Sequence, residues 1–369
     1  MKRYMIALAA AFGLLACASA NEEIIEDRIS SDAADFRLIE LADGIPNPWG
    51  FAFLPEGGIL ITQRSGRLWR LEEGGSLNEI STGLEVRASG QGGLLDVALH
   101  PDYSANGWIY LSHVVAGPAG NSTAVSRGRL SGGSLTDLER IFTANGGGST
   151  TRHFGSRLAF DDEGYLYITL GDRGEMDRAQ DPSDHAGSVV RLFDDGRIPS
   201  DNPYDEVYSY GHRNAQGMVF DEVSGSVWVN EHGAKGGDEI NRIKSGANYG
   251  WPRISYGTHY SGAKIGIGTS AAGMEQPELY WDPSIAPSGM AVYSGAAFPG
   301  WEGDLFVGAL RGEHLRRIER SGGRLTGGEE VLLQGVVGRI RDVRLGPDGY
   351  LYLLTDERNG GLYRLEPVD

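Results

Sequence analysis

The chain has 369 residues, 40% of them hydrophobic and 22% charged, and its formal net charge is −17 at pH 7. This hydrophobic content is typical of a folded globular protein and excludes a largely disordered chain. A surface with so many acidic groups repels nucleic acid and anionic lipid, so we expect no nucleic-acid partner. An anionic small molecule could bind only in a pocket with a local excess of basic side chains.

The first twenty residues have the order of charged, apolar and small residues that is typical of a secretory signal peptide. Two basic residues precede an apolar run over residues 5–15, and the A-x-A sequence at 18–20 offers a cleavage site before Asn21. Residues 14–17 also resemble a bacterial lipobox, so cleavage before Cys17 would leave that residue lipidated and tethered to the membrane. Cys17 is the only cysteine, and both alternatives predict a protein of the periplasm or cell envelope.

An acidic N-terminal segment at residues 21–40 precedes a single domain at residues 41–369, and its stretch from residue 21 to 35 is expected to form a tether or a loose start. In that domain one sequence pattern recurs six times. It consists of an apolar strand, a turn rich in Pro, Asp and Gly, an aromatic-rich strand, and a strand that ends in a basic-apolar pair. Such strand repeats indicate radial β repetition, so we predict an all-β, six-bladed β-propeller. Only three of the four strands that a blade needs can be recognised in each copy. The copies span residues 49–71, 95–130, 158–192, 218–243, 290–318 and 343–365.

Basic and amide side chains occupy matching positions at the edges of different repeats. In a propeller these positions converge on one central mouth, although they are far apart in the sequence. The planar guanidinium group suits carboxylates and phosphates, so converging arginines predict a small polyanionic ligand. The alternative is that each arginine simply pairs with one of the fifty acidic residues. The residues are Gln91, Arg213, Asn214, Arg311, Arg339 and Arg341.

Seven segments, in order and at matching spacings, together resemble the soluble quinoprotein glucose/sorbosone dehydrogenase family. The similarity is closest to its aldose sugar dehydrogenase branch and runs from about residue 46 to 365. It implies a six-bladed propeller that binds pyrroloquinoline quinone (PQQ), a rigid tricarboxylate, over the central mouth together with a calcium ion. The segments are GQGGLLDVALHP at 90–101, GD at 171–172, YGHRNAQG at 210–217, GDEIN at 237–241, NYGWP at 248–252, YWDPSIAPSGM at 280–290 and RIRDV at 339–343.

The resemblance also implies a role for individual residues. His153 would be the general base that removes a proton from the sugar hydroxyl, Asp172 would orient its imidazole, and Arg213 would polarise the quinone or hold the substrate. Some relatives have a lysine at the position of Arg311. The arginine keeps the positive charge but replaces a compact ammonium group with a planar guanidinium group. The PQQ contacts implied are Gln91, His153, Arg213, Asn214, Arg311, Arg339 and Arg341.

Two calcium ions are implied. The main-chain carbonyl oxygens of Gly233 and Ala234 would bind the ion beside PQQ, and relatives often have proline at the second of these positions. A second, structural ion is implied near Glu239 and the main-chain carbonyl of Tyr249, because calcium prefers oxygen ligands. A solvated turn is the alternative explanation for Glu239.

Oxidation of an aldose to its lactone, with electrons passed to an unidentified acceptor, is the activity that this resemblance implies. A calcium-dependent lactonase on a six-bladed propeller is one alternative, but it would need carboxylate side chains and an asparagine converging on the ion. A cofactor-free binding propeller of the cell envelope is another, and it would leave Arg213, Arg339 and Arg341 as surface ion pairs.

Overall fold

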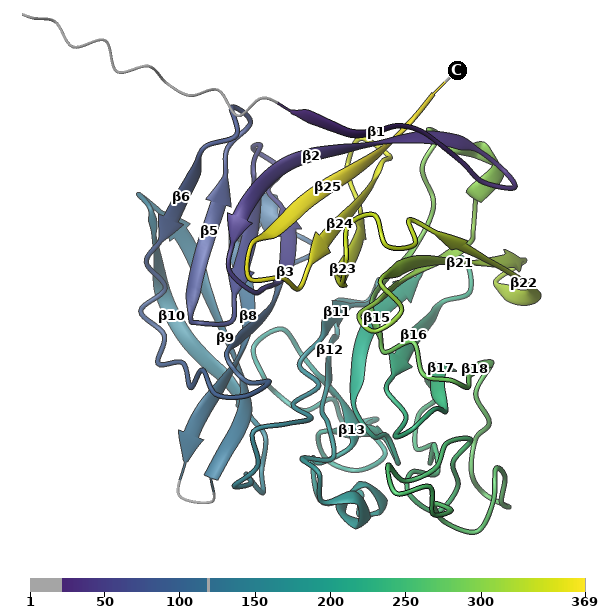
Figure 1. Cartoon of the computed structure of the whole chain (residues 1–369). Helices are drawn as coiled ribbons and strands as arrows, with labels where there is room; N and C mark the ends of the chain where they lie inside the picture. The colour runs from purple at the N-terminus through teal and green to yellow at the C-terminus, as the bar shows by residue number, and fades with distance from the viewer. Residues whose placement is uncertain (1–21, 118–119, 369) are drawn as a thin grey trace, which may run out of the picture.

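The structure is a computed structural model that describes residues 22–117 and 120–368, so the predicted signal peptide and Cys17 lie outside the described residues. The described residues form six antiparallel sheets arranged around a central axis (Figure 1). This confirms the predicted all-β, six-bladed β-propeller. The helical segments are short: α1 (Tyr103–Asn106), η1 (Met176–Gln180) and η2 (Pro299–Trp301). No helix within the described ranges is long and apolar enough to cross a membrane.

Five blades are four-stranded antiparallel sheets in which each strand pairs with the next along the chain. Blade one contains β3 (Pro48–Phe53), β4 (Ile59–Gln63), β5 (Arg67–Leu71) and β6 (Leu77–Ile80); blade two contains β7 (Leu94–Leu99), β8 (Trp108–Gly117), β9 (Gly120–Ser131) and β10 (Ser134–Thr143). Blade three contains β11 (Leu158–Phe160), β12 (Leu166–Thr169), β13 (Ser188–Leu192) and β14 (Val207–Tyr210); blade four contains β15 (Ala215–Asp221), β16 (Ser226–Glu231), β17 (Asp238–Arg242) and β18 (Leu279–Trp281). Blade five contains β19 (Pro287–Val292), β20 (Leu305–Ala309), β21 (His314–Ser321) and β22 (Arg324–Leu332).

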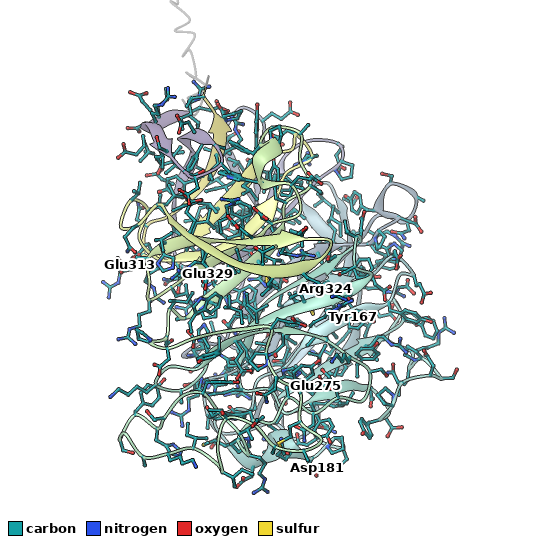
Figure 2. The ribbon with its side chains drawn as sticks, turned by 90° about the vertical axis from the view of Figure 1, so that its right-hand side faces the viewer. Tyr167, Asp181, Glu275, Glu313, Arg324 and Glu329 are labelled. Carbon is teal, nitrogen blue, oxygen red and sulfur yellow. The ribbon has the colours of Figure 1, made fainter. Side chains whose placement is uncertain are left out.

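The first strands of successive blades contact one another around the axis. The contacts run from β3 through β7, β11, β15 and β19 to β23 (Ile340–Leu345), and β23 returns to β3. Strands near the axis are mostly buried on both faces, and some of them, such as β20, are continuous apolar runs. Outer strands are far more polar: on β22, Arg324 and Glu329 are exposed (Figure 2). This polarity explains why the fourth strand of each repeat could not be recognised in the sequence.

Blade six joins the two ends of the chain. It orders β23, β24 (Leu351–Thr355), β25 (Gly360–Pro367), β2 (Asp35–Ile45) and β1 (Glu23–Ser30), and in Figure 1 the purple β1 and β2 lie beside the yellow β25. β2 pairs antiparallel with β25, from Phe36 opposite Pro367 to Ile45 opposite Gly360. The expectation of a tether or loose start at residues 21–35 is therefore wrong for the described part, residues 22–35. Its acidic residues lie mostly on the exposed β1, whereas Phe36 of β2 is fully buried against Trp301.

Candidate active site

A histidine and an aspartate form a close pair between blades two and three. His153 Nδ1 lies 2.6 Å from Asp172 Oδ1, and their side chains are 12% and 1% exposed. The Gln91 side-chain oxygen accepts a hydrogen bond from the main-chain nitrogen of His153 at 2.6 Å. Burial lowers the pKa of His153 below its usual value, although the hydrogen bond with Asp172 opposes this shift. The imidazole is therefore neutral at pH 7.

The backbone that carries this pair is tightly folded. His153 and Ser156 both have positive φ, at 54° and 82°, a conformation that is uncommon for residues other than glycine. A Cβ atom at Gly171 would collide with the carbonyl oxygen of His153, so only glycine allows the loop after β12 to approach so closely. Such sparsely populated backbone conformations persist only where the surrounding structure holds them in place. They are frequent at functional sites.

The Asp172 carboxylate accepts hydrogen bonds from three donors. Its Oδ1 accepts from Gly174 N at 2.7 Å as well as from His153, and its Oδ2 accepts from Trp251 Nε1 at 2.8 Å. Burial would raise the pKa of Asp172, but its hydrogen bond and charge interaction with His153 outweigh this and lower the pKa. An ionised carboxylate can only accept, so the proton of the neutral imidazole lies on Nδ1. The Nε2 lone pair of His153 is therefore free to accept a proton.

Arg213 lies close enough to this pair for its positive charge to lower the pKa of His153. Its Nη1 donates to the carbonyl oxygen of His232 at 3.1 Å, and its main-chain nitrogen donates to Glu231 at 2.6 Å. The guanidinium carbon is 5.2 Å from the centre of the Trp251 ring, within the range of a cation–π interaction. Arg213 is thus held mainly by neutral groups, which leaves its charge available to a ligand.

A cavity of about 180 Å³ at the same end of the propeller contains three arginines and one carboxylate. Arg339 and Arg341 donate to the same oxygen of Asp356, at 3.2 and 2.8 Å. Burial opposes ionisation of Asp356, yet Arg341, Arg64 and Arg339 lower its pKa to about 2. Among the described residues, the buried Nε atoms of Arg64 and Arg341 have no hydrogen-bond partner. This excess of positive charge and free donors fits an anion with several carboxylates.

The lining residues of the cavity share two kinds of position in the blades. Each lies where the first strand of a blade begins or where the second strand has just ended, and antiparallel order brings these points to one end of the propeller. We call this end the mouth. Its cavity is lined by Trp49, Arg64, Gln91, Leu95, Phe154, Gly155, Asn214, Gln216, His232, Ala286, Leu310, Arg339, Arg341 and Asp356.

The structure therefore brings together most of the residues singled out in the sequence. Gln91, Asn214, Arg339 and Arg341 line the cavity, and the first of these also binds the His153 loop. Arg311 differs: it is exposed and lies outside the described lining, although its neighbour Leu310 is part of it. Sequence reasoning missed Trp49, Arg64, Gln216, Asp356 and Trp251. The first four share the positions described above, which could have identified them.

The loop after β16 carries the two predicted carbonyl ligands of a calcium ion. Gly233 N donates to Asp238 Oδ1 at 2.8 Å, which turns the chain sharply, and Ala234 belongs to a buried hydrophobic cluster that includes Trp251. A Cβ atom at Gly233 would collide with the carbonyl oxygen of Gly236, so this turn requires glycine. No three His, Cys, Asp or Glu side chains gather at a metal-binding distance anywhere in the described part of the chain. Calcium held here would therefore depend on main-chain oxygens.

The second predicted calcium position contains two carboxylates, Glu231 and Glu239, and one cation, Arg213. Glu231, Glu239 and Tyr249 line one small cavity beside the same loop. Burial and, after it, the charge of Glu231 raise the pKa of Glu239 to about 8. Asn241 Nδ2 donates a hydrogen bond to one oxygen of Glu239 at 3.2 Å. A bound cation would supply the missing positive charge, so the residues fit a calcium ion.

Comparisons with known proteins give one consistent relationship. A family model described as Glucose / Sorbosone dehydrogenase matches residues 45–364. The chain is 45% identical over 341 residues to Aldose sugar dehydrogenase YliI of Escherichia coli (strain K12), which covers 89% of this chain and 92% of that protein. The solved apo-form of soluble aldose sugar dehydrogenase from Escherichia coli has a TM-score of 0.87 at 44% identity, over 90% of this chain and 100% of that one. The PQQ-bound aldose sugar dehydrogenase from Streptomyces coelicolor has a TM-score of 0.75 at 29% identity, over 89% and 96%. The chain belongs to the glucose/sorbosone dehydrogenase family of sugar oxidoreductases, in its aldose sugar dehydrogenase branch.

Proposed function

We propose that the protein oxidises aldose sugars to the corresponding lactones with PQQ and calcium, and that His153 is the general base. The observation that carries this proposal is the His153–Asp172 pair beside a cavity with three arginines. The PQQ-bound form of a relative at 29% identity supports the choice of cofactor. Bound PQQ supplies a quinone carbonyl that accepts hydride, and a calcium ion polarises that carbonyl.

The mouth residues would hold the carboxylates of the cofactor. Arg339 and Arg341 present guanidinium groups that are shared with a single carboxylate, Asp356, so both retain donors for a ligand. Gln91 and Asn214 line the same cavity and supply neutral amide groups, and Arg213 stands beside the His153–Asp172 pair. Arg311, which is exposed at the edge of the mouth, would reach the cofactor only from outside this cavity.

His153 has the protonation state that a general base needs. Its Nδ1 proton is directed at Asp172, so Nε2 is free to accept a proton. We propose that it accepts the proton of the sugar hydroxyl while hydride leaves the carbon that bears this hydroxyl. The imidazolium that forms is stabilised by the ionised Asp172 at 2.6 Å. Arg213 opposes protonation of the imidazole and keeps it neutral before the reaction. The pair thus holds the base ready and stabilises its charged form after proton transfer.

The carbonyl oxygens of Gly233 and Ala234 would bind the calcium ion beside PQQ. Glu239 and the main-chain carbonyl of Tyr249 would bind the second ion, which we assign a structural role. Both positions lie on the loop after β16 or against it, so the two ions would order the same part of the mouth.

The two alternative functions are less well supported. A lactonase would need several carboxylates around one calcium ion, whereas no group of three such side chains occurs in the described residues. A cofactor-free binding propeller gives no reason for three arginines to converge on a cavity that contains a single carboxylate, Asp356. We further propose an aldose substrate, an electron acceptor whose identity is open, and a location in the periplasm or cell envelope, with membrane tethering through Cys17 if it is lipidated.

Purified apoprotein should be tested with calcium and PQQ, first for PQQ binding by calorimetry and then for dye reduction with glucose and other aldoses. We expect His153→Ala to abolish turnover and largely retain PQQ binding, and Arg339→Ala to weaken PQQ binding first. Arg324→Ala is the matched control, because Arg324 is exposed on the outer strand β22. The absence of both PQQ binding and dye reduction would rule out the proposed enzyme. Wild-type behaviour of both mouth variants would show that the site is assigned wrongly.

A further inference from the structure

Trp251 reaches from blade four to the aspartate of blade three. It lies in the connection between β17 and β18, its side chain is buried, and its Nε1 donates to Asp172 Oδ2 at 2.8 Å. Its backbone is fixed at both ends of the residue: Trp251 N donates to the carbonyl oxygen of Gly211 at 2.8 Å, and its own carbonyl oxygen accepts from Gln180 at 2.7 Å. The indole N–H therefore has a defined place from which to hold the carboxylate.

The same indole ring touches two further parts of the candidate site. The guanidinium group of Arg213 lies 5.2 Å from its centre, and Trp251 belongs to the same buried hydrophobic cluster as Ala234 in the predicted calcium loop. Trp251 thus contacts the partner of the base and the arginine beside the base, and it shares a buried cluster with the loop that would hold the metal. Nothing in the assigned chemistry requires a tryptophan here for reaction with the substrate, since its N–H is directed at Asp172.

We infer that Trp251 is a positioning residue that fixes the Asp172 carboxylate with its Oδ1 toward His153 and thereby sets the proton affinity of that histidine. This inference rests on the proposed function of His153 as the base. Without the indole donor, Oδ2 becomes a buried carboxylate oxygen that lacks this hydrogen bond, while Oδ1 stays bound to His153 Nδ1 and Gly174 N. The negative charge available to His153 also increases, because fewer donors share it.

The expected change has a definite sign. A stronger negative field at His153 Nδ1 favours the imidazolium form, so loss of the indole N–H raises the pKa of His153. The other charged groups that act on His153 are Asp172 itself and the cations Arg213 and Arg152. Arg173, whose guanidinium donates to the carbonyl oxygen of His153, is the remaining charged neighbour. The change Trp251→Phe alters none of these groups and keeps an aromatic ring beside Arg213.

The test is a proton NMR titration of the His153 ring in PQQ-free protein. We expect Trp251→Phe to raise the pKa of His153 by about half to one pH unit, and the acid limb of kcat/KM in PQQ-loaded protein to move to higher pH by the same amount. Trp281→Phe is a matched control: Trp281 is 7% exposed against 6% for Trp251, and it also donates to a carboxylate, Glu329, at 2.8 Å. The control should leave the His153 titration unchanged. An unshifted His153 titration in folded Trp251→Phe protein would overturn the inference.

A second measurement covers the case in which Trp251→Phe does not fold. In wild-type apoprotein the Trp251 Nε1–H resonance should lie downfield, as expected for a hydrogen bond to a carboxylate, and it should shift as His153 titrates. A resonance that does not respond to His153 would equally overturn the inference. Both NMR measurements use apoprotein, so they are independent of sugar oxidation. A failure to bind PQQ or oxidise aldoses would contradict the proposed function while leaving the positioning role of Trp251 decided by the titration.

Discussion

The substitution Asp172→Asn tests the proposed mechanism at its most constrained point. Asp172 accepts from His153 Nδ1 and Gly174 N at one oxygen and from Trp251 Nε1 at the other. An asparagine has one acceptor oxygen and one NH₂ group, which only donates. If its oxygen faces His153, its NH₂ faces the indole N–H. If its oxygen faces Trp251, its NH₂ faces His153 and Gly174, so either orientation leaves two donors opposed in a buried place.

The second orientation also changes the base itself. An NH₂ group directed at His153 Nδ1 requires that nitrogen to accept, which moves the imidazole proton to Nε2 and removes the lone pair that would take the substrate proton. The same Asp→Asn change in a Ser-His-Asp triad lowers kcat by about 10⁴-fold through the wrong tautomer. Because Asp172 is equally buried and its hydrogen bond to His153 is 2.6 Å, we expect kcat/KM to fall by about 10³- to 10⁴-fold, or about 4 to 5 kcal/mol.

Dye-coupled oxidation of an aldose by PQQ-loaded protein is the assay, with PQQ affinity measured separately by calorimetry. PQQ affinity should change little, because Asp172 lies outside the residues that line the arginine cavity. Asp162→Asn is a control for the charge change, since Asp162 is exposed in the turn between β11 and β12. If Asp172→Asn retained kcat/KM within tenfold of wild type while binding PQQ normally, His153 would not depend on Asp172 and the reasoning would be refuted.

Three further predictions concern stability. Phe36→Ala should destabilise the fold by about 3 to 5 kcal/mol by leaving a cavity beside Trp301, whereas Ile24→Ala on the exposed β1 should have little effect; thermal unfolding distinguishes them. Burial lowers the pKa of His113 from 6.5 to about 4 in the folded protein. As the pH decreases, His113 is therefore protonated in the unfolded chain before it is protonated in the folded protein. The free energy of unfolding should fall by about 3 kcal/mol between pH 6.5 and pH 4. His113→Gln should remove this part of the pH dependence in denaturant titrations. Chelation of calcium should lower the melting temperature, and Glu239→Gln should reduce that sensitivity by removing the contribution of the second ion, whereas the exposed Glu222→Gln should not.

The fold was predictable because the inner strands are recognisable in two ways, by their apolar composition and by their recurrence along the chain. Segments such as 351–355 are apolar and buried, and they recur at similar distances from Pro/Asp/Gly turns, so the sequence indicates both strands and their number of repeats. The outer strands could not be predicted in this way, because β22 and β10 are largely exposed and have no apolar face to repeat. β1 and β2 were misjudged for a different reason. Their acidic composition suggested a free tail, but Phe36, Leu38 and Ile39 of β2 are buried, and β2 pairs with the C-terminal strand β25.

The site was predictable where the chemistry of a residue type coincided with a position in the repeat. Arg339 and Arg341 stand at the start of a first strand, and both reached the cavity, as expected from convergence at the mouth. Arg311 follows a second strand, yet it is exposed, because the position fixes where the backbone goes and not the direction of the side chain. Trp251 could not be found from position, since it lies on a long connection between third and fourth strands. Only the three-dimensional path of that connection brings its indole to Asp172.

The closure of the propeller and the candidate site depend on the same blade. Arg339, Arg341 and Asp356 all belong to blade six, whose outer strands come from the N-terminal end of the chain. The His153–Asp172 pair instead lies between blades two and three, where every strand is local in sequence. Loosening the pairing of β2 with β25 should therefore disturb the arginines that would bind the cofactor before it disturbs the base. Arg213 lies in the link between blades three and four, on the opposite side of the ring from blade six. An anion that binds both Arg213 and the arginines of blade six would therefore connect the two sides. Its binding free energy would add directly to the stability of the closed propeller.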